Sequence, residues 1–229
     1  LEPFKGKEPE EVFTQAFEPP KSDGSGNIRA NQRVAFELFR KAGWELKDGK
    51  LVNAKTGQPF TFEILLDNPM FERIVQPYLR NLGRAGIIAT IRMVDSAQYQ
   101  NRMNNFDFDM IVGSFGESLS PGNEQRNYWS SAAASQEGSH NFAGVKDPVV
   151  DALVDQLIAA PDRDTLINTT RALDRVLLWG WYVIPQWHND HHRVASWDRF
   201  GHPATPAKYG LPFEATWWVD RAKDAALHR

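Results

Sequence analysis

Hydrophobic and polar residues follow two different spacings between Pro59 and Glu117, and together they predict strand, helix, strand, helix and strand in succession. The run FTFEILL, residues 60–66, ends in continuous apolar residues, which is typical of a strand covered on both faces. Apolar positions three and four apart then predict a helix that begins at Pro69 and ends near Gly83 to Gly86. These elements make the first half of a βαβ arrangement.

The second half repeats that alternation in shorter elements. Residues 87–94, IIATIRMV, predict a strand, and Ser96 can cap a short helix through Met103. Residues 106–115, FDFDMIVGSF, predict a third strand. Because crossovers between parallel strands are right-handed, the three strands should be parallel neighbours in one sheet. The predicted fold class is α/β, with a mostly parallel central sheet flanked by helices.

The regions on either side of this sheet are less regular. Residues 1–27 contain several Pro and Gly and predict an extended linker on the surface. A helix should follow Asn27 and stop at Gly43, and a hairpin should turn at Asp48-Gly49. Residues 118–144 are polar and small, and they predict a long loop.

Two helices and a strand are expected after that loop. Asp147 with Pro148 caps the first helix, which runs through Ile158, and the second spans about residues 162–180. We expect both to cover the sheet. YVIPQW, residues 182–187, predicts a final strand before an irregular tail.

The candidate binding site lies just past the strand 106–115, because ligands of open parallel sheets sit at the carboxyl ends of the strands. Glu117 could hold a cationic group such as an amine there, although a lone loop glutamate is more often simply solvated. Apolar walls and backbone donors at the amino end of a neighbouring helix favour a site. The predicted ligand-binding residues are Glu117, Phe115, Ser114, Gly116, Asn68 and Trp129.

Composition narrows the class of partner. The 229 residues carry a net charge of −3, which provides no electrostatic footprint for nucleic acid, so no such partner is predicted. The chain has no cysteine, so thiol chemistry and thiolate metal sites are excluded. No stretch resembles a membrane span or a leader peptide, and we interpret the amino end as cut from a longer protein.

Motifs of common enzymes and cofactor sites are missing from the sequence. Asp107 and Asp109 share one face of the predicted strand at the end away from the expected site, so we expect no catalysis and no cofactor. The histidines of WHNDHHR could meet on a helix and bind a metal. Their context predicts a strand and turn, which separates these side chains, so no metal site is predicted for His188, His191 and His192.

Three segments resemble a known family in order and spacing: AFELFRKAGWELKDGKLVNAKTGQPFTFEILL, then PYLRNLGRAGIIATIRMVDSAQYQNRMNNFDFDMIVGSF, then DPVVDALVDQLIAAPDRDTLINTTRALDRVLLWGWYVIPQW. They resemble the carboxyl-terminal lobe of the extracellular solute-binding proteins that serve oligopeptide, dipeptide and nickel ABC importers. The run SPGNEQRNYW is most similar to the branch linked to peptide and microcin uptake. The resemblance covers about residues 27–200.

The resemblance implies a periplasmic protein of two lobes, whose amino-terminal lobe is missing here and which delivers a peptide-like solute to a cognate ABC permease. Residues 1–27 would be the linker from that lobe, 28–190 the α/β substrate-binding lobe, and 191–229 a return segment toward the missing lobe and hinge. Glu117 matches the acidic residue that holds the peptide's amino group in relatives. It replaces their Asp, and Ser114 replaces their usual Trp.

The same resemblance implies a role for the tryptophans near the end of the chain. Trp217 and Trp218 stand beside a polar terminus, and from the sequence alone they could pack on this domain or against another part of the protein. With the lobe missing, we expect the tail to pack in a non-native way or through contacts between molecules.

Two other functions remain open at this point. The same lobe can serve as the ligand-sensing module of a regulator, which a DNA-binding helix pair upstream of Leu1 would indicate. A catalytic α/β domain is the less favoured alternative, since it would need an acid, base or nucleophile constellation that the sequence does not display.

Overall fold

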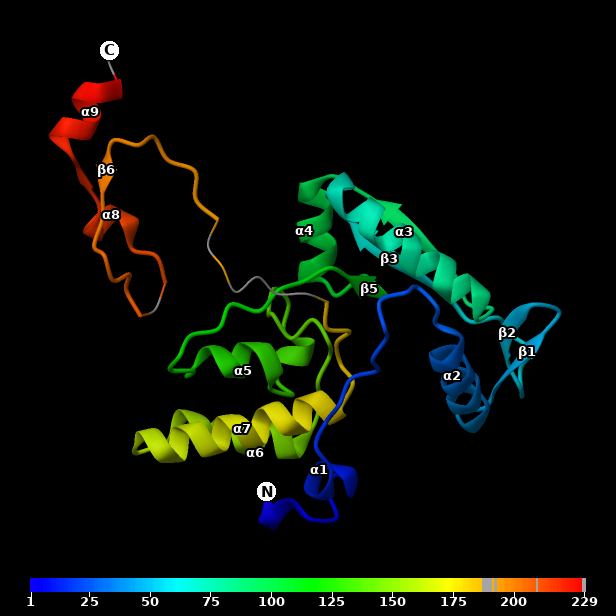
Figure 1. Ribbon diagram of the computed structural model, residues 1–229. Helices are drawn as coiled ribbons and strands as arrows, with labels where there is room; N and C mark the ends of the chain where they lie inside the picture. The colour runs from blue at the N-terminus through cyan, green and yellow to red at the C-terminus, as the bar shows by residue number, and fades with distance from the viewer. Residues whose placement is uncertain (187–190, 192, 209, 228–229) are drawn as a thin grey trace. The chain divides into compact units, whose positions relative to one another are not determined.

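The computed structural model describes residues 1–186, 191, 193–208 and 210–227. The chain divides into two compact units, Leu1–Val183 and Ile184–Arg229, whose elements are drawn in Figure 1. The predicted boundary after residue 190 therefore lies later than the division in the structure. The assignment of the tail to another lobe stays a prediction.

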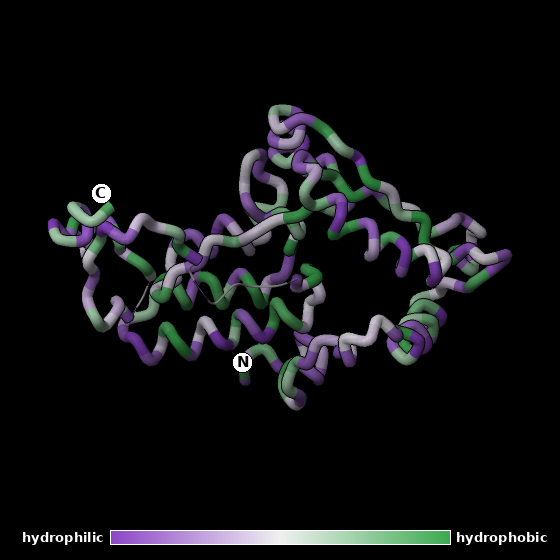
Figure 2. Tube along the Cα trace, turned by 45° about the horizontal axis from the view of Figure 1, so that its top comes forward, coloured by the Kyte–Doolittle hydropathy of each residue, from purple (hydrophilic) through white to green (hydrophobic). Residues whose placement is uncertain are grey.

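The first unit contains the whole predicted α/β region. Its elements, in chain order, are η1 (Glu2–Phe4), α1 (Glu11–Thr14), α2 (Arg29–Lys41), β1 (Trp44–Lys47), β2 (Lys50–Asn53), β3 (Thr61–Leu66), α3 (Pro69–Arg84), β4 (Ile88–Met93), α4 (Ser96–Asn104), β5 (Met110–Ile111), α5 (Glu124–Trp129), η2 (Ala133–Ser135), α6 (Pro148–Ile158) and α7 (Arg163–Trp179). Hydrophobic and hydrophilic residues alternate in short runs along the chain, as expected for helices that bury only one face (Figure 2).

Strands β4, β3 and β5 form a parallel sheet in that order, which confirms the predicted parallel neighbours. Central strand β3 is buried at its carboxyl end, where Ile64, Leu65 and Leu66 are at most 2% exposed. Ile64 and Leu66 pack with Val75 of α3 in a group that we call the sheet cluster. Helix α3 therefore covers one face of the sheet.

The β1–β2 hairpin is fastened to the turn between α3 and β4. Leu51 N–H donates to Gly86 O at 2.8 Å, which brings the two backbones together. Gly86 has φ of +82°, and a Cβ placed on it would lie 2.6 Å from both Leu46 Cδ1 and Leu51 N. Only glycine fits this turn without a shift of backbone.

Four of the longer helices begin with a side-chain cap. Asn68, Asp147 and Asp162 each accept a hydrogen bond from a backbone N–H in the first turn of α3, α6 and α7. At α4 the cap is Asp95, which accepts from Gln98 N–H at 2.9 Å, so the prediction of Ser96 as the cap is wrong. The longer carboxylate side chain of Asp95 reaches the N–H three residues along.

Strand β5 is much shorter than the predicted 106–115 strand, and the correction has a local cause. Phe106 has φ of +55°, which breaks extended backbone. Arg102 Nε donates to Asp107 O at 2.9 Å and lies 3.0 Å from Asp107 Oδ2. Asp109 Oδ2 then accepts from Glu63 N–H at 2.9 Å, where a longer β5 would place a carbonyl. Pairing with β3 begins only at Met110.

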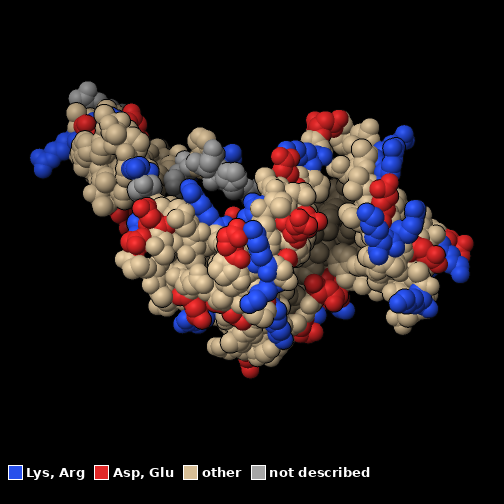
Figure 3. All heavy atoms as spheres, turned by 90° about the horizontal axis from the view of Figure 1, so that it is seen from below, with Lys and Arg blue, Asp and Glu red and all other residues tan. Residues whose placement is uncertain are grey.

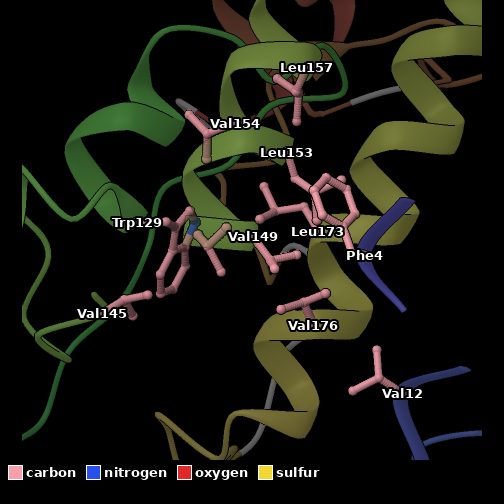
Figure 4. Close-up of a cluster of buried hydrophobic side chains, with 11 residues drawn as sticks. Phe4, Val12, Trp129, Val145, Val149, Leu153, Val154, Leu157, Leu173 and Val176 are labelled. Carbon is pink, nitrogen blue, oxygen red and sulfur yellow. The ribbon is translucent and has the colours of Figure 1, made fainter. Parts of the chain in front are cut away.

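Helices α6 and α7 pack on each other, and their apolar faces form a second core that includes no residue of the three strands. Their predicted role as a cover for the sheet is therefore wrong. Figure 4 shows most of these side chains converging from the helices and from the amino-terminal segment. We call this group the helical cluster: Phe4, Val12, Trp129, Val145, Val149, Val150, Leu153, Val154, Leu157, Leu173 and Val176.

The amino-terminal segment takes part in this core, contrary to its predicted place on the surface. Val12 is 0% exposed and Phe4 is 8% exposed. Arg175 of α7 donates to the backbone carbonyls of Val12 and Gln15, at the carboxyl end of α1. Leu1 and Phe13 also pack against the helical cluster. Whether residues 1–27 also link two lobes stays a prediction.

The region predicted as a loop, 118–144, is partly helical and has a polar interior. It contains α5 and η2, and Asn141 within it is 0% exposed. Asn141 Nδ2 donates to Ser130 O and to Val145 O, both at 2.9 Å, and its Oδ1 accepts from Val145 N–H at 2.8 Å. One side chain thus joins the backbone at residues 130 and 145.

The predicted strand 182–187 is absent from its described part, residues 182–186. A strand needs a hydrogen-bonded neighbour, and these residues have none among the described strands. Val183 and Ile184 are accordingly 45% and 53% exposed.

The second unit is small and rich in exposed aromatic residues. Its elements are β6 (Phe200–Gly201), α8 (Phe213–Thr216), β7 (Trp218–Val219) and α9 (Arg221–Leu227). Trp217 lies against Phe200 and His202, and Trp218 is 53% exposed. The predicted packing of this tail against another lobe or molecule stays a prediction.

Candidate functional site

The candidate site is built on residues 112–118, which extend from the carboxyl end of β5 without regular structure. Two tyrosines hold this segment by hydrogen bonds, one from a helix that precedes it in the sequence and one from a helix that follows it. Tyr99 of α4 donates to Val112 O at 3.1 Å, and Tyr128 of α5 donates to Gly116 O, also at 3.1 Å. The segment that carries Ser114 to Glu117 is therefore positioned by two helices.

Glu117 is exposed and is tied to the core through one buried amide. Gln125 Nε2 donates to Glu117 Oε2 at 2.6 Å, and Gln125 Oε1 accepts from Trp129 Nε1 at 3.1 Å. Gln125 and Trp129 are 4% and 9% exposed. A hydrogen-bonded chain thus runs from the core indole to the surface carboxylate.

A second carboxylate lies beside the first. Gln125 Nε2 is 3.4 Å from Glu124 Oε1, which also accepts from Gly122 N–H at 2.7 Å. Among the described residues neither Glu117 nor Glu124 has a cationic side chain within 4.0 Å. Figure 3 shows acidic and basic side chains interspersed over the face it presents. The arrangement suits a positively charged group of a ligand.

The two carboxyl groups differ in their acidity. Partial desolvation raises the pKa of Glu117, the hydrogen bond from Gln125 opposes this shift, and the Glu124 carboxylate adds to it. Although desolvation works against it, donation from the Gly122 backbone lowers the pKa of Glu124. Glu117 is therefore the member of the pair whose charge is less stable without a cation nearby.

Aromatic rings support the segment from behind. Phe115 lies 4.6 Å from Trp129 and 5.5 Å from Tyr128 between ring centroids. Trp129 belongs to the helical cluster, so it backs the site and is not an open wall of it. Phe115 remains half-buried at the border between core and site.

The other predicted site residues are placed in different ways. Asn68 follows β3 at the same sheet edge, but its Oδ1 is used to accept from Met70 N–H at 2.9 Å. Ser114 lines a hollow of about 340 Å³ whose other walls come from α4 and from residues 138–142. Gly116 contributes its carbonyl to Tyr128. The ligand-binding role of all six residues stays a prediction.

Sequence reasoning missed Gln125 and Glu124. The spacing of four between Gln125 and Trp129 was a usable signal, because such pairs meet on a helix. The small and polar residues around them indicated a loop and hid the short helix α5.

Asp107 and Asp109 have structural partners in Arg102 and in the backbone of β3. The described residues contain no group of three His, Asp or Glu side chains suited to a metal ion. His188 and His192 lie outside the part of the chain that the structure describes. No helix in that part has the length and apolar character needed to cross a membrane.

Comparison with known proteins defines the family. Residues 5–137 match the middle part of the bacterial extracellular solute-binding proteins, family 5, and the chain belongs to this family. It is 48% identical to an uncharacterized protein of Sinorhizobium fredii, covering 100% of this chain and 34% of that protein. It is 44% identical to the probable peptide-binding protein YejA of Agrobacterium fabrum, covering 97% and 36%. The chain spans about a third of the length of these relatives.

The fold is shared with solved structures. The oligopeptide-binding protein AppA from Bacillus subtilis, in complex with a nonapeptide, superposes with a TM-score of 0.59 at 23% identity, covering 72% of this chain and 32% of AppA. This similarity confirms the predicted lobe fold of periplasmic binding proteins.

Proposed function

We propose that the protein is the substrate-binding component of an ABC importer, which captures a peptide-like solute between two lobes and delivers it to its permease in the periplasm. This chain would supply most of one lobe, with residues 28–190 as its α/β body. Family membership, the peptide-binding relative and the span of about a third of the relatives' length support this proposal.

The unpaired carboxylates at the carboxyl end of the sheet carry the proposal. Glu117 is held by Gln125 with Glu124 beside it, and no cation within the described residues neutralises the pair. The amino group of a peptide could complete this arrangement by donating to Glu117. Charge-assisted hydrogen bonds are the stronger ones, at roughly 1.5–3 kcal/mol each.

Binding of the remaining solute would depend on closure of the two lobes. Backbone hydrogen bonds can hold any peptide, while the pocket walls select among side groups. Closure excludes water from the charge pair and strengthens it. This chain by itself should bind weakly, because the contacts of the second lobe would be absent.

The test uses the whole protein and tripeptides that differ only in the amino terminus, free or acetylated. Replacing Glu117 by Gln should weaken binding of the free-amine peptides by at least about tenfold in Kd, equivalent to 1.4 kcal/mol. Acetylated peptides should bind the variant and the unmodified protein alike. Calorimetric titration measures both.

Glu137→Gln is the matched control, since Glu137 is an exposed glutamate of the same region. It should leave the affinity unchanged. Equal affinity of Glu117→Gln and the unmodified protein for free-amine peptides would refute the proposal that Glu117 binds the amino group. Absence of any ligand-induced melting shift with a peptide library would contradict the transport proposal itself.

A further inference from the structure

We infer that the hollow beside Ser114 is a selectivity pocket for an uncharged, hydrogen-bonding side group of the bound solute; this rests on the proposed function. The hollow lies between α4, the carboxyl end of β5 and residues 138–142. Its volume of about 340 Å³ is at the lower end of the roughly 300–1,000 Å³ of ligand sites. That size suits a side group better than a whole peptide.

The lining mixes polar and apolar side chains and carries no Asp, Glu, Lys or Arg. Gln100 and Asn104 are one turn apart on α4, and Gln100 Nε2 donates to Asn104 Oδ1 at 2.8 Å. This bond leaves Gln100 Oε1 as an acceptor and Asn104 Nδ2 as a donor without a partner in the described residues. The Ser114 hydroxyl is likewise unengaged there. One acceptor, one donor and one hydroxyl match an amide or alcohol group.

His140 completes the polar side of the hollow. Asn127 Nδ2 lies 2.7 Å from His140 Nδ1, which leaves Nε2 as the ring nitrogen without a partner in the described residues. The ring stands 5.3 Å from Phe142 and 5.9 Å from Tyr128 between centroids, which fixes its plane. His140 Nε2 therefore adds another hydrogen-bonding group to the lining.

A charged side group has no counter-charge in this lining. Closing the site over a lysine or glutamate side chain would remove its water without a compensating ion pair, which costs several kcal/mol. A neutral polar group gives up less hydration free energy on burial, and it can form new hydrogen bonds with the atoms that have no partner. The pocket should therefore disfavour both positively and negatively charged side groups.

The chain geometry relates this pocket to the amine anchor. Ser114 and Glu117 are three residues apart, so their Cα atoms are separated by at most about 11 Å. A peptide advances by a similar roughly 3.3–3.6 Å per residue. A solute held by its amino group at Glu117 can therefore reach the pocket with a side chain of one of its first three residues.

The experiment compares the whole protein with a Gln100→Glu variant against tripeptides of alanine in which one position is Gln, Ser, Lys or Glu. The unmodified protein should bind the Gln and Ser peptides at least about tenfold more tightly than the Lys and Glu peptides at one position. Gln100→Glu should improve the Lys peptide by at least about tenfold and leave the Glu peptide weak.

Gln98→Glu provides the matched control, because it makes the same change at an exposed position of α4 outside the lining. It should leave the order of affinities unchanged. If Gln100→Glu behaves like Gln98→Glu while the peptides still bind, the assignment of the hollow as a selectivity pocket is refuted and the proposed function stands. If the unmodified protein binds no peptide, the proposed function fails and the pocket assignment falls with it.

Discussion

Asn141 should be among the most sensitive positions of the first unit. Its side chain is 0% exposed and makes three hydrogen bonds, to Ser130 O, Val145 O and Val145 N–H. Removing it in Asn141→Ala leaves Val145 O and Val145 N–H without these partners, while Ser130 O keeps only the bond from Ala134 N–H at 3.3 Å. Each bond contributes about 1 kcal/mol net, so the free energy of unfolding should fall by about 3 kcal/mol.

The loss can be measured by urea unfolding followed by far-ultraviolet circular dichroism. With an m value near 2 kcal/mol/M, about 3 kcal/mol lowers the urea midpoint by about 1.5 M. Asn105→Ala is the control, since Asn105 is exposed and makes a single side-chain bond, to Asn101 O at 2.8 Å. It should lower stability by no more than about 0.5 kcal/mol.

A second variant distinguishes the effect of lost hydrogen bonds on stability from the effect of lost side-chain volume. Asn141→Asp keeps the volume and the acceptor but loses both donations and introduces a buried charge. It should therefore destabilise the protein at least as much as Asn141→Ala. If either variant costs no more than Asn105→Ala, the structural role assigned to the Asn141 amide is refuted.

Three further outcomes are expected. Gly86→Ala should destabilise the protein by about 2 kcal/mol or more in urea unfolding, whereas Gly83→Ala in helix α3 should be neutral or stabilising; equal effects would contradict the close contact at Gly86. Burial and the charge of Asp147 raise the pKa of Glu8 to about 7, so folding retains a proton between about pH 4.5 and 7 and stability falls as the pH rises through that window. Glu8→Gln should accordingly raise Tm at pH 8 and change it little at pH 5, and an equal change at both pH values would speak against the buried carboxyl. Because the pKa of Glu117 is raised, binding of free-amine peptides to the whole protein should begin to weaken on acidification at a higher pH than it would with an ordinary glutamate. Titration calorimetry from pH 7 to 4 measures this affinity, and an affinity that does not change with pH would contradict the role of Glu117.

The longer helices could be predicted because several signals agree in each. Helix α6 combines an Asp147 cap, Pro148 in its first turn and apolar residues at helical spacing. The parallel arrangement of the three strands in one sheet followed from the handedness of crossovers. Local chemistry and topology were sufficient for these elements.

The failures have physical causes that lie outside local patterns. The alternation around Asp107 and Asp109 is typical of a strand, yet Arg102 and the Glu63 backbone engage both carboxylates and delay pairing to Met110. A predicted strand at 182–187 lacks a neighbour. Such outcomes depend on tertiary partners that sequence spacing does not reveal.

The place of Glu117 in the fold was predicted, but the side chain that holds it was not. Glu117 lies past a strand end as expected, because the carboxyl ends of parallel strands meet at one edge. Gln125, which holds it, comes from the region that was predicted as a loop. The hollow beside Ser114 requires three segments to meet, which no single pattern indicates.

The brevity of β5 has a consequence for the behaviour of the protein in concentrated solution. As an outer strand of its sheet it pairs with β3 through only Met110 and Ile111. A long, flat outer strand offers a template on which strands of other molecules can add, and short strands with nearby charges prevent this. The ion pair of Arg102 with Asp107 and the bent backbone that curtail β5 should therefore make this edge a poor template for strand addition.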